Sequence, residues 1–457
     1  MQKTLILAIV SPMLLAAQDR PNVLFFFTDD QRADTISALG NPHIQTPVLD
    51  SLVERGYVFN NNYCFGSNEG AVCLPSRNML LSGRVYFRHT AKAGGRNTRN
   101  YASGDKANFA DSMKALGYET YHHGKIGNVA QLIHKKFDHS AYVNHREERI
   151  TGEPGKKIVD DAIEFVKNRD ASNPFFLYLA VSVPHDPRVA LDKYMKLYDR
   201  EKIPLPKNYL PQLPFDNGEM IVRDEALAPW PRTKDEVRKH LHDYYAVITA
   251  MDRHLGRLLD SVDLDNTIVI FSSDHGLAIG SHGLFGKQSV YEHSMKAPLI
   301  LAGPGVGKGR SDAFVYLHDI YPSVVDLLGG AVPSGLDGKS FVPVIKGETK
   351  ATRNSVFLAY KDSQRAVRQG DYKLIRFPQI DKTQLFDLGR DPHEINDISG
   401  DSNQRQRIEK LTAEMKRWQG EVGDSQTLQV ANPKPAAFVA PTGEALKTLL
   451  DRWRGIN

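Results

Sequence analysis

Cysteine is scarce in this chain, whose 457 residues include only Cys64 and Cys73. A single pair cannot provide the disulfide framework of a small secreted domain, and no further cysteine completes a zinc site. The two thiols could pair with each other in an oxidising compartment. If Cys73 instead carries out chemistry, Cys64 remains a single packed thiol. The two interpretations exclude each other, so the state of this pair is a direct test.

Charge of one sign is also lacking, because 58 lysines and arginines are balanced by 54 aspartates and glutamates, for a formal net charge of +4. The balance is too even to indicate binding to nucleic acid, and the sequence has no run of lysines or arginines. The composition, 41% hydrophobic and 25% charged, is that of an ordinary globular protein. The length is sufficient for one large domain with a smaller one beside it.

Long apolar runs are missing beyond the N-terminus. Lys3 precedes an apolar run from Leu5 to Leu15, and Ala16-Ala17 stand before polar residues. This order is typical of a signal peptide cleaved after Ala17, although a buried first strand is the alternative. No lipobox cysteine follows, and no later stretch is long enough to cross a membrane as a helix. We therefore expect residues 1–17 to be a signal peptide and the mature protein to be secreted or periplasmic, with no stable membrane anchor.

Four strand-like runs each end in polar residues, as strands of a mostly parallel sheet do at the edge where open α/β sheets bind ligands. The runs and the residues that follow them are 22–28 with Asp29 and Asp30, 119–122 with Gly124 and Lys125, 174–181 with Pro184 and His185, and 266–273 with Asp274 and His275. Because the pattern recurs, it predicts that these polar side chains meet in one site.

Amphipathic helices are predicted between these strands. The clearest runs from Lys234 to about Val262 behind Thr233 as its N-cap, with apolar residues every three or four positions. Another is expected over residues 155–168. Residues 191–232 are rich in proline and charge and lack periodicity, which indicates a long surface excursion. The alternation of strands and helices favours a large, mostly parallel sheet sandwiched by helices.

After Gly347 the pattern changes to short strands within residues 355–388 and a helix near residues 403–421. This predicts a small α+β subdomain with a short antiparallel sheet. We therefore divide the chain after the signal peptide into a large domain, a C-terminal subdomain and a C-terminal extension, at residues 18–347, 348–425 and 426–457.

Cys73-Leu-Pro-Ser-Arg77 is the most informative motif of the chain. It follows a loop of small residues, and Pro75 fits the opening of a helix, where a missing N–H costs little. Such a position offers unpaired N–H donors and the positive end of the helix dipole, which favour an anion. Arg77 adds a permanently charged donor for oxyanions. A buried, inert cysteine is the alternative interpretation.

The C-x-P-S-R motif, followed by Ser82-Gly83-Arg84, resembles the signature of the type I, formylglycine-dependent sulfatases of the alkaline phosphatase superfamily. In that family a separate maturase oxidises the cysteine to Cα-formylglycine, whose hydrated aldehyde is the nucleophile. One hydroxyl attacks sulfur, and the other expels sulfate as the aldehyde re-forms, an exit that a serine ester lacks. The resemblance covers roughly residues 20–420, and it implies an alkaline-phosphatase-like fold with a catalytic larger domain.

Asp29, Asp30, Asp274 and His275 form the predicted metal site. Carboxylate oxygens suit hard divalent cations, and adjacent aspartates at a strand end repel each other unless a cation lies between them. A solvated turn explains one aspartate but not the whole set. The resemblance implies that these four residues hold Ca²⁺. Since His275 is a softer donor than the asparagine of many members, Mn²⁺ and Mg²⁺ stay open.

Lys125, His185 and Lys287 match the family's sulfate-binding and leaving-group residues, on the segments Gly124-Lys125, Pro184-His185 and Gly280 to Lys287. Fixed cations are what charge developing on a sulfuryl group requires. By resemblance, Lys125 and Lys287 contact sulfate, while His185 or Lys287 protonates the departing alcohol.

The chain departs from the family at Gly127. Many members read G-K-x-H, and that histidine contacts the formylglycine and helps to eliminate sulfate. Here Gly124-Lys125-Ile126-Gly127 has no histidine at the corresponding position. His122, His123 or His134 could substitute for it, or the step proceeds differently.

A second group of polar residues is less specific. Arg365 and Arg368 could reach over the cleft from the smaller subdomain and bind acidic sugar groups. The histidines and the aspartate of this group lie beside a strand end or in a glycine-rich loop, where structural and substrate-binding roles are equally open: Asp186, His282, His293 and His318.

Together these features predict an exported sulfuric ester hydrolase that acts on a sulfated carbohydrate. The carbohydrate part follows from export and from the frequency of such substrates in the family, not from any single residue. A phosphonate monoester hydrolase or phosphodiesterase of the same superfamily is the nearest alternative. A non-catalytic protein that binds sulfated glycans is another, although the retained lysines and metal ligands speak against it.

Overall fold

The computed structural model describes residues 20–93 and 99–454, so the predicted signal peptide lies outside the described residues. Its main feature is an eight-stranded sheet with the strand order β11-β2-β10-β9-β1-β8-β6-β7. The strands are β1 (Asn22–Asp29), β2 (Tyr57–Tyr63), β6 (Glu119–Lys125), β7 (His139–Val143), β8 (Phe175–Pro184), β9 (Thr267–Ser273), β10 (Leu299–Ala302) and β11 (Gly309–Tyr316). Only β10 pairs antiparallel with its neighbours, which confirms the mostly parallel sheet.

The strand β1 lies in the middle of this sheet, parallel to both β8 and β9. All of its residues are buried, as its unbroken apolar run predicts. Phe25 and Phe27 face one hydrophobic cluster, whereas Leu24 and Phe26 face the other. Because successive side chains point to opposite faces of a strand, this one segment anchors both helical layers.

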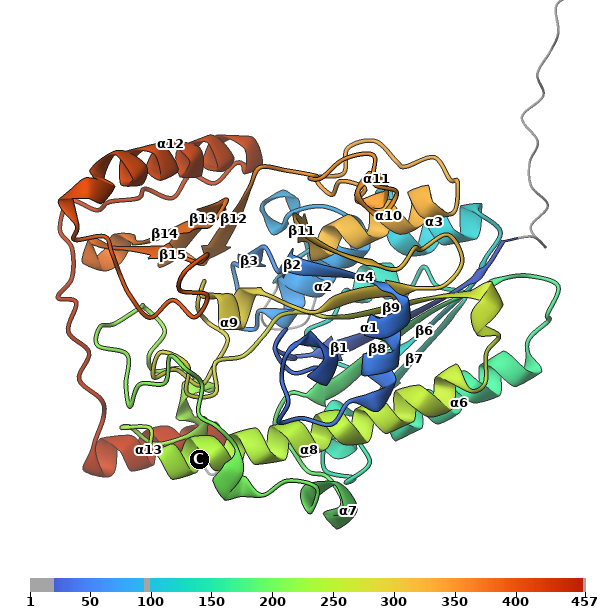
Figure 1. The fold of residues 1–457 in the computed structure, drawn as a ribbon, viewed down its shortest axis with the longest axis horizontal. Coiled ribbons are helices and arrows are strands. Elements are labelled where there is room, and N and C mark those ends of the chain that lie inside the picture. Colours follow the sequence, from blue (N-terminus) through green and yellow to red (C-terminus); the bar gives the residue numbers. More distant parts are fainter. Residues whose placement is uncertain (1–19, 94–98, 455–457) are drawn as a thin grey trace, which may run out of the picture.

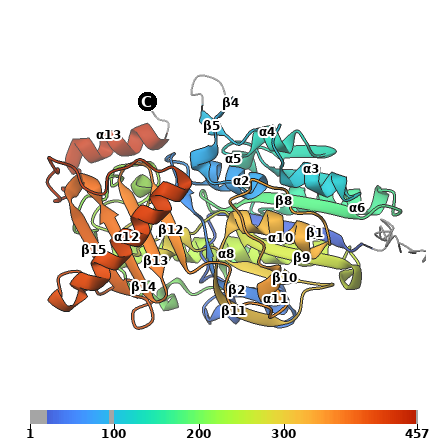
Figure 2. The ribbon, with the colours of Figure 1, turned by 90° about the horizontal axis from the view of Figure 1, so that it is seen from above.

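Helices cover both faces of the large sheet (Figures 1 and 2). One layer is built from α1 (Pro47–Arg55), α6 (Lys156–Asn168) and α8 (Lys234–Leu259), and the other from α2 (Cys73–Ser82), α3 (Phe109–Ala115), α4 (Gln131–His134) and α10 (Ile320–Leu327). The predicted N-cap of α8 is confirmed, since the Thr233 side chain accepts a hydrogen bond from the Glu236 N–H at 3.2 Å. The helix ends at Leu259, earlier than predicted, and its apolar stripe packs on the sheet.

A five-stranded sheet forms the second unit, beside the large sheet (Figure 1). It comprises β12 (Ser355–Tyr360), β13 (Gln364–Gln369), β14 (Tyr372–Phe377), β15 (Lys382–Asp387) and the short β3 (Gly66–Ser67), with α12 (Arg405–Val422) against it. The strand β3, which was not predicted, comes from the loop before Cys73. Gly66 permits this approach, because a Cβ there would lie 1.9 Å from the Ala359 carbonyl oxygen.

The surface excursion over residues 191–232 holds little regular structure beyond α7 (Asp192–Met195) and short turns. It is anchored by Glu225, whose carboxylate accepts hydrogen bonds from the N–H groups of Phe285 and Gly286 and pairs with Arg232. The remaining elements are β4 (Ala91–Ala93), β5 (Arg99–Tyr101), α5 (His145–Glu148), α9 (Glu292–Met295), α11 (Val342–Ile345) and α13 (Gly443–Arg454). Through the contacts of Glu225 with Phe285 and Gly286, the excursion packs over the loop that follows β9 and leads to Lys287.

Candidate active site

Cys73 is the first residue of α2 and lies at the carboxyl ends of β1 and β9. Its Sγ atom is 3.3 Å from His275 Nε2, 3.5 Å from Lys287 Nζ and 3.8 Å from Asp30 Oδ1. The residue is 1% exposed, and burial raises the pKa of its thiol well above the ordinary value. An unmodified thiol here is therefore protonated at neutral pH and a weak nucleophile.

The other cysteine has no part in this cluster. Both thiols are free, and the Cys64 Sγ packs in the hydrophobic core 3.9 Å from the Gly66 carbonyl oxygen. The structure thus has the arrangement in which Cys64 is a single packed thiol, not the one in which it pairs with Cys73.

The predicted metal ligands converge because β1 and β9 are parallel neighbours in register. Thr28 pairs with Ser273, so the residues that follow them meet at one edge of the sheet. The Asp30 N–H donates to Asp274 Oδ1 at 3.0 Å, and His275 Nε2 lies 3.4 Å from an oxygen of each of these carboxylates. Asp30 has a φ of 70°, a strained backbone that directs its carboxylate towards Cys73.

Buried cations surround these carboxylates. Lys125 Nζ lies 2.7 and 2.8 Å from the oxygens of Asp29, and Lys287 Nζ lies 2.8 and 2.9 Å from those of Asp30. Arg77 donates to an oxygen of Asp274 at 3.1 Å and to one of Asp29 at 3.3 Å. Burial raises the pKa of Asp29, but the cations around it outweigh burial and hold this pKa well below its usual range.

Arg149 belongs to the same cluster, although no sequence pattern predicts it. Its guanidinium donates at 2.8 Å to Asp29 Oδ2, to the Ser182 carbonyl oxygen and to the Asp186 carbonyl oxygen. The residue follows the short helix α5 in a segment of mixed charge, without a motif. Only the fold brings it to β1 and β8.

His185 is held by its neighbour and by the excursion. Its Nδ1 lies 2.8 Å from the Asp186 carbonyl oxygen and 3.3 Å from the Asp186 carboxylate, so its Nε2 faces Asp30 at 3.9 Å. Arg223 in turn donates to that carboxylate at 2.7 Å. Burial raises the pKa of Asp186, but His185 and Arg223 lower it well below its usual range. An ionised carboxylate therefore fixes the orientation of the ring.

Gly127 lies against a histidine that was not predicted. A Cβ at Gly127 would be 3.3 Å from Cε1 of His145, and the φ of 92° disfavours a side chain there. His145 Nδ1 is buried and finds no hydrogen-bond partner among the described residues. The predicted substitutes lie elsewhere, because His122 stacks on His134 at 3.7 Å and His123 pairs with Asp161 at 2.8 Å.

Three other candidates make internal contacts away from Cys73. His282 Nε2 lies 2.8 Å from the Glu394 carbonyl oxygen, and its ring stacks on Tyr291. Arg365 forms a bidentate pair with Asp424, at 2.7 and 2.9 Å. Arg368 donates to the Tyr63 hydroxyl at 2.6 Å and to Glu292 at 3.2 Å. The structure does not bring them to the cluster around Cys73.

The donor atoms of the cluster fit a hard divalent cation. Three groups of ligand atoms each lie within 4.8 Å of one another: Asp30, Cys73 and His275; Asp29, Cys73 and Asp274; and Asp29, Asp30 and His185. Three buried carboxylates and an imidazole are oxygen-rich ligands of the kind that Ca²⁺, Mg²⁺ and Mn²⁺ accept.

The fold is that of the alkaline phosphatase superfamily, to which the similar sulfatases belong. Within it, the sulfatase family profile matches residues 21–331, so the chain belongs to the sulfatase family. The C-terminal profile of N-sulphoglucosamine sulphohydrolase matches residues 280–421. The resemblance drawn from Cys73 to Arg77 is thereby confirmed, and the chain is an enzyme of the sulfatase class.

The curated relatives match over most of their length. An N-acetylglucosamine-6-O-sulfatase of Bacteroides thetaiotaomicron is 26% identical, over 89% of this chain and 87% of that protein. An arylsulfatase of Clostridium perfringens is 25% identical, over 86% of this chain and 93% of that protein.

Solved structures share the fold. BT4656, in complex with its substrate D-glucosamine-2-N,6-O-disulfate, has a TM-score of 0.75 at 24% identity and covers 90% of this chain and 99% of its own. A phosphonate monoester hydrolase of Agrobacterium radiobacter has a TM-score of 0.72 at 18% identity and covers 88% and 96%. Since the same fold carries both chemistries, function has to be argued from the site.

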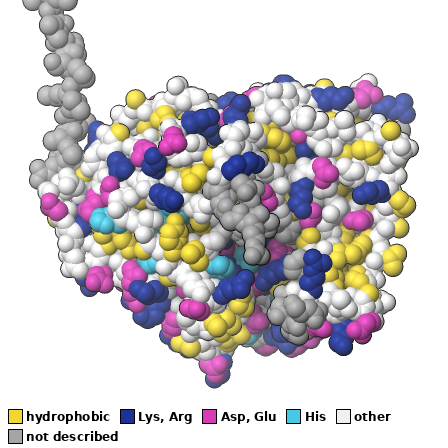
Figure 3. Space-filling view, turned by 180° about the vertical axis from the view of Figure 1, so that it is seen from behind, with side chains coloured by type: hydrophobic (Ala, Val, Ile, Leu, Met, Phe, Trp, Pro, Cys, Tyr) yellow, Lys and Arg dark blue, Asp and Glu magenta, His cyan; other side chains and the backbone are white. Residues whose placement is uncertain are grey.

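The surface gives two further observations. Among the described residues, no helix combines the length and the hydrophobicity that crossing a membrane requires. On the face in Figure 3, lysine and arginine side chains are interspersed with aspartate and glutamate.

Proposed function

We propose that this sulfatase hydrolyses a sulfate ester of a sulfated carbohydrate, with residue 73 as the nucleophile after conversion to Cα-formylglycine. The observation that carries the proposal is the convergence of Cys73 with three buried carboxylates, two lysines and two histidines at one edge of the sheet. The raised pKa of the thiol supports the conversion, because an unmodified Cys73 is a weak nucleophile.

In this proposal the site is completed by the modification of residue 73 and by a bound divalent cation. The hydrated formylglycine supplies one hydroxyl that attacks sulfur and another that releases sulfate as the aldehyde re-forms. Ca²⁺, with Mn²⁺ or Mg²⁺ as alternatives, would supply positive charge that stabilises the sulfate group. Its ligands would be Asp29, Asp30, Asp274 and His275.

Arg77, Lys125 and Lys287 stabilise the negative charge that develops on the sulfuryl group. All three are buried, with at most 2% exposure, so their charges act in a medium that screens little. Their contacts with the aspartates hold them in place before substrate arrives. A donor fixed in advance needs no reorganisation during the reaction.

Lys287, or His185 in its doubly protonated form, gives a proton to the departing alcohol oxygen as the bond from that oxygen to sulfur breaks. The Nδ1–H of His185 donates to the Asp186 carbonyl oxygen, so its Nε2, which faces the cluster, has a proton to give only in the imidazolium form. His145 takes the role that Gly127 cannot fill, and accepts the proton of the second hydroxyl when sulfate leaves. Its support is the ring's place against Gly127 and its unpartnered Nδ1.

The substrate class follows from the relatives. Several curated proteins with similar sequences are named for sugar substrates, including the N-acetylglucosamine-6-O-sulfatase and an ulvan-active sulfatase of Formosa agariphila. We place residues 18–347 as the catalytic domain and residues 348–425 as the C-terminal subdomain. A cleaved leader at residues 1–17 and a formylglycine-generating maturase in the producing cell complete the proposal.

The decisive experiment combines mass spectrometry with kinetics. Protein made with a maturase should yield a peptide in which residue 73 carries the aldehyde, and should hydrolyse nitrophenyl sulfate faster than nitrophenyl phosphonate. A strong preference for the phosphonate would instead identify a phosphonate monoester hydrolase. Retention of an intact thiol after native maturation, together with binding of sulfated glycans, would identify a non-catalytic binding protein.

A further inference from the structure

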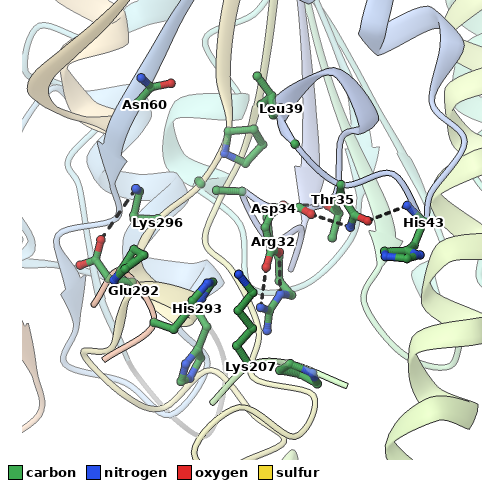
Figure 4. A pocket seen from close by; sticks show the side chains of 18 of the residues that line it. Arg32, Asp34, Thr35, Leu39, His43, Asn60, Lys207, Glu292, His293 and Lys296 are labelled. Atoms are coloured by element: carbon green, nitrogen blue, oxygen red, sulfur yellow. Dashed lines mark hydrogen bonds and ion pairs between the residues drawn. The ribbon is translucent and has the colours of Figure 1, made fainter. Parts of the chain in front are cut away.

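A pocket of about 630 Å³ is lined by residues outside the cluster around Cys73, and Figure 4 shows it from close by. Its walls come from the loop after β1, the excursion near residues 204–208, the segment 292–298 and residues 392–394. None of the residues assigned to catalysis or metal binding lines it. The volume is that of a small-molecule site, and larger than an inorganic anion fills.

The two sites share the segment that leaves β1. The Asp30 carbonyl oxygen accepts from the Tyr244 hydroxyl, and the Arg32 N–H donates to the same hydroxyl. The Asp30 carboxylate points to Cys73, whereas the Arg32 guanidinium reaches the carbonyl oxygens of Leu277 and Ala278 and lines the pocket. The pocket thus adjoins the segment that carries the metal ligands, and Cys73 is not among the residues that line it.

The acidic side chains of the pocket are already neutralised. Asp34 accepts two hydrogen bonds from Arg32, at 2.8 and 2.7 Å. Glu292 and Glu394 both pair with the buried Lys373, at 2.9 and 2.8 Å. Their charges therefore contribute little net negative potential to a ligand in the pocket.

The basic side chains, in contrast, include unpaired ones. The side chains of Lys207 and Arg310 are exposed at the pocket and make no hydrogen bond or ion pair with any residue in the described part of the chain. Figure 4 shows the Lys207 side chain extending towards the middle of the pocket, beside Arg32 and His293. The pocket therefore carries an excess of positive charge that an anion can neutralise.

His293 adds a built-in donor. The residue is 9% exposed, its Nε2 lies 3.3 Å from the Ser289 hydroxyl, and its Nδ1 is buried with no partner among the described residues. In the tautomer in which Nε2 accepts from the Ser289 hydroxyl, Nδ1 carries the proton and donates it in a hydrogen bond to a ligand. A buried polar atom without a partner costs free energy, which a bound oxyanion would recover.

We propose that this pocket binds a sulfated saccharide unit and does not hydrolyse it. Lys207, Arg310 and His293 would hold the sulfate, and the apolar side chains of Phe59, Leu241 and Tyr245 would contact the sugar ring. The inference rests on the proposed function, because it takes the ligand from the same class as the substrate. It extends that function from one catalytic centre to a second recognition site.

The test uses the full chain with Cys73→Ala, so that bound glycan is not turned over. Calorimetry compares a heparin oligosaccharide, its desulfated form and inorganic sulfate. The double variant Lys207→Glu/Arg310→Glu should weaken binding of the sulfated oligosaccharide about tenfold or more, which corresponds to ~1.4 kcal/mol. Lys410→Glu, the same charge change on an exposed residue of α12, should leave binding unchanged.

A second measurement separates this inference from the proposed function. With Cys73 intact, the double variant should hydrolyse nitrophenyl sulfate as the parent does, because neither residue touches the catalytic cluster. Equal binding of the oligosaccharide by parent and double variant would refute the second site. So would equal binding of the desulfated form, or a response to inorganic sulfate alone. An enzyme inactive on every sulfate ester would refute the proposed function instead.

Discussion

Two dense clusters of buried charge in the described part of the chain differ in function, because one of them surrounds a reactive side chain and the other does not. Around Cys73, the carboxylates of Asp29 and Asp30 each face a lysine, but Arg77 keeps an Nη1 without a partner in the described chain. In the second cluster, between the two sheets, Lys373 bridges Glu292 and Glu394 while Arg368 also pairs with Glu292.

The two clusters differ in whether their buried cations pair only with carboxylates or also face a point where an anion can bind. In the cluster of Lys373 the charges pair with one another, and they join β13 and β14 of the small sheet to α9 and to Glu394. In the cluster of Cys73 the cations converge on a point where an anion can bind. Arg368, predicted from sequence as a substrate contact, lies in the cluster of Lys373 and not in that of Cys73. Residue type alone does not separate the two kinds.

The largest effect on activity should come from replacing Cys73, with Cys64 as the control. Cys73→Ala should lower kcat on nitrophenyl sulfate by at least about 10³-fold, because the nucleophile is lost. Cys64→Ala, its matched control, should keep kcat and lose only stability. Kinetics and thermal melts of both variants check this. Loss of activity in both, without unfolding, would mean that Cys64 takes part in the chemistry.

The next effect concerns a lysine of the reactive cluster. Lys287→Met removes a cation 3.5 Å from the Cys73 Sγ, and kcat should fall about 10²–10³-fold. The affinity for nitrophenyl sulfate and for sulfate as an inhibitor separates binding from catalysis. An unchanged kcat would mean that Lys287 stabilises the fold, as Lys373 does, and does not take part in catalysis.

The matching change in the other cluster should act on stability. Lys373→Met leaves Glu292 and Glu394 buried without their shared cation, so the free energy of unfolding should fall by about 3–5 kcal/mol. The kcat of the protein that remains folded should be unchanged. Denaturant titration gives the first quantity, and kinetics below the transition gives the second.

Metal binding should distinguish the clusters through thermal stability. A chelator should abolish activity, and Ca²⁺ at about 100 times its Kd should stabilise the fold by about 2.7 kcal/mol. Asp274→Asn should lose this stabilisation, whereas Lys373→Met should keep it. Mn²⁺ and Mg²⁺ are tested in the same melts. Stabilisation that survives in Asp274→Asn would place the metal elsewhere.

The smallest effect is a pH dependence in the structural cluster. Burial raises the pKa of Glu394 to about 6, despite the opposing charge of Lys373. The folded state then holds this proton more tightly than the unfolded state. The contribution is fully present below about pH 4.5 and is lost as the pH rises through about 6. Unfolding of Glu394→Gln should lack this slope, which amounts to about 1–2 kcal/mol in the parent.

Much of the reactive cluster was predictable because its residues follow apolar runs directly. Asp29, Asp30, Asp274 and His275 stand at the ends of two runs that form buried parallel strands, and such ends meet at one edge. Lys125 and His185 follow the same logic on β6 and β8. His145 and Arg149 come after β7 (His139–Val143), whose mixed sequence does not predict a strand, so no pattern marked them.

What the sequence by itself determined is therefore the large parallel sheet, its helical layers and the residues at its carboxyl edge, because apolar periodicity is local and strong. What only the tertiary structure decided is which distant charges meet. The pairing of Arg365 with Asp424, the strand β3 beside β12 and the approach of His145 to Gly127 depend on contacts between segments far apart in the chain. The residues next to a charged side chain in the sequence do not identify its partner, because long-range packing determines which charges meet.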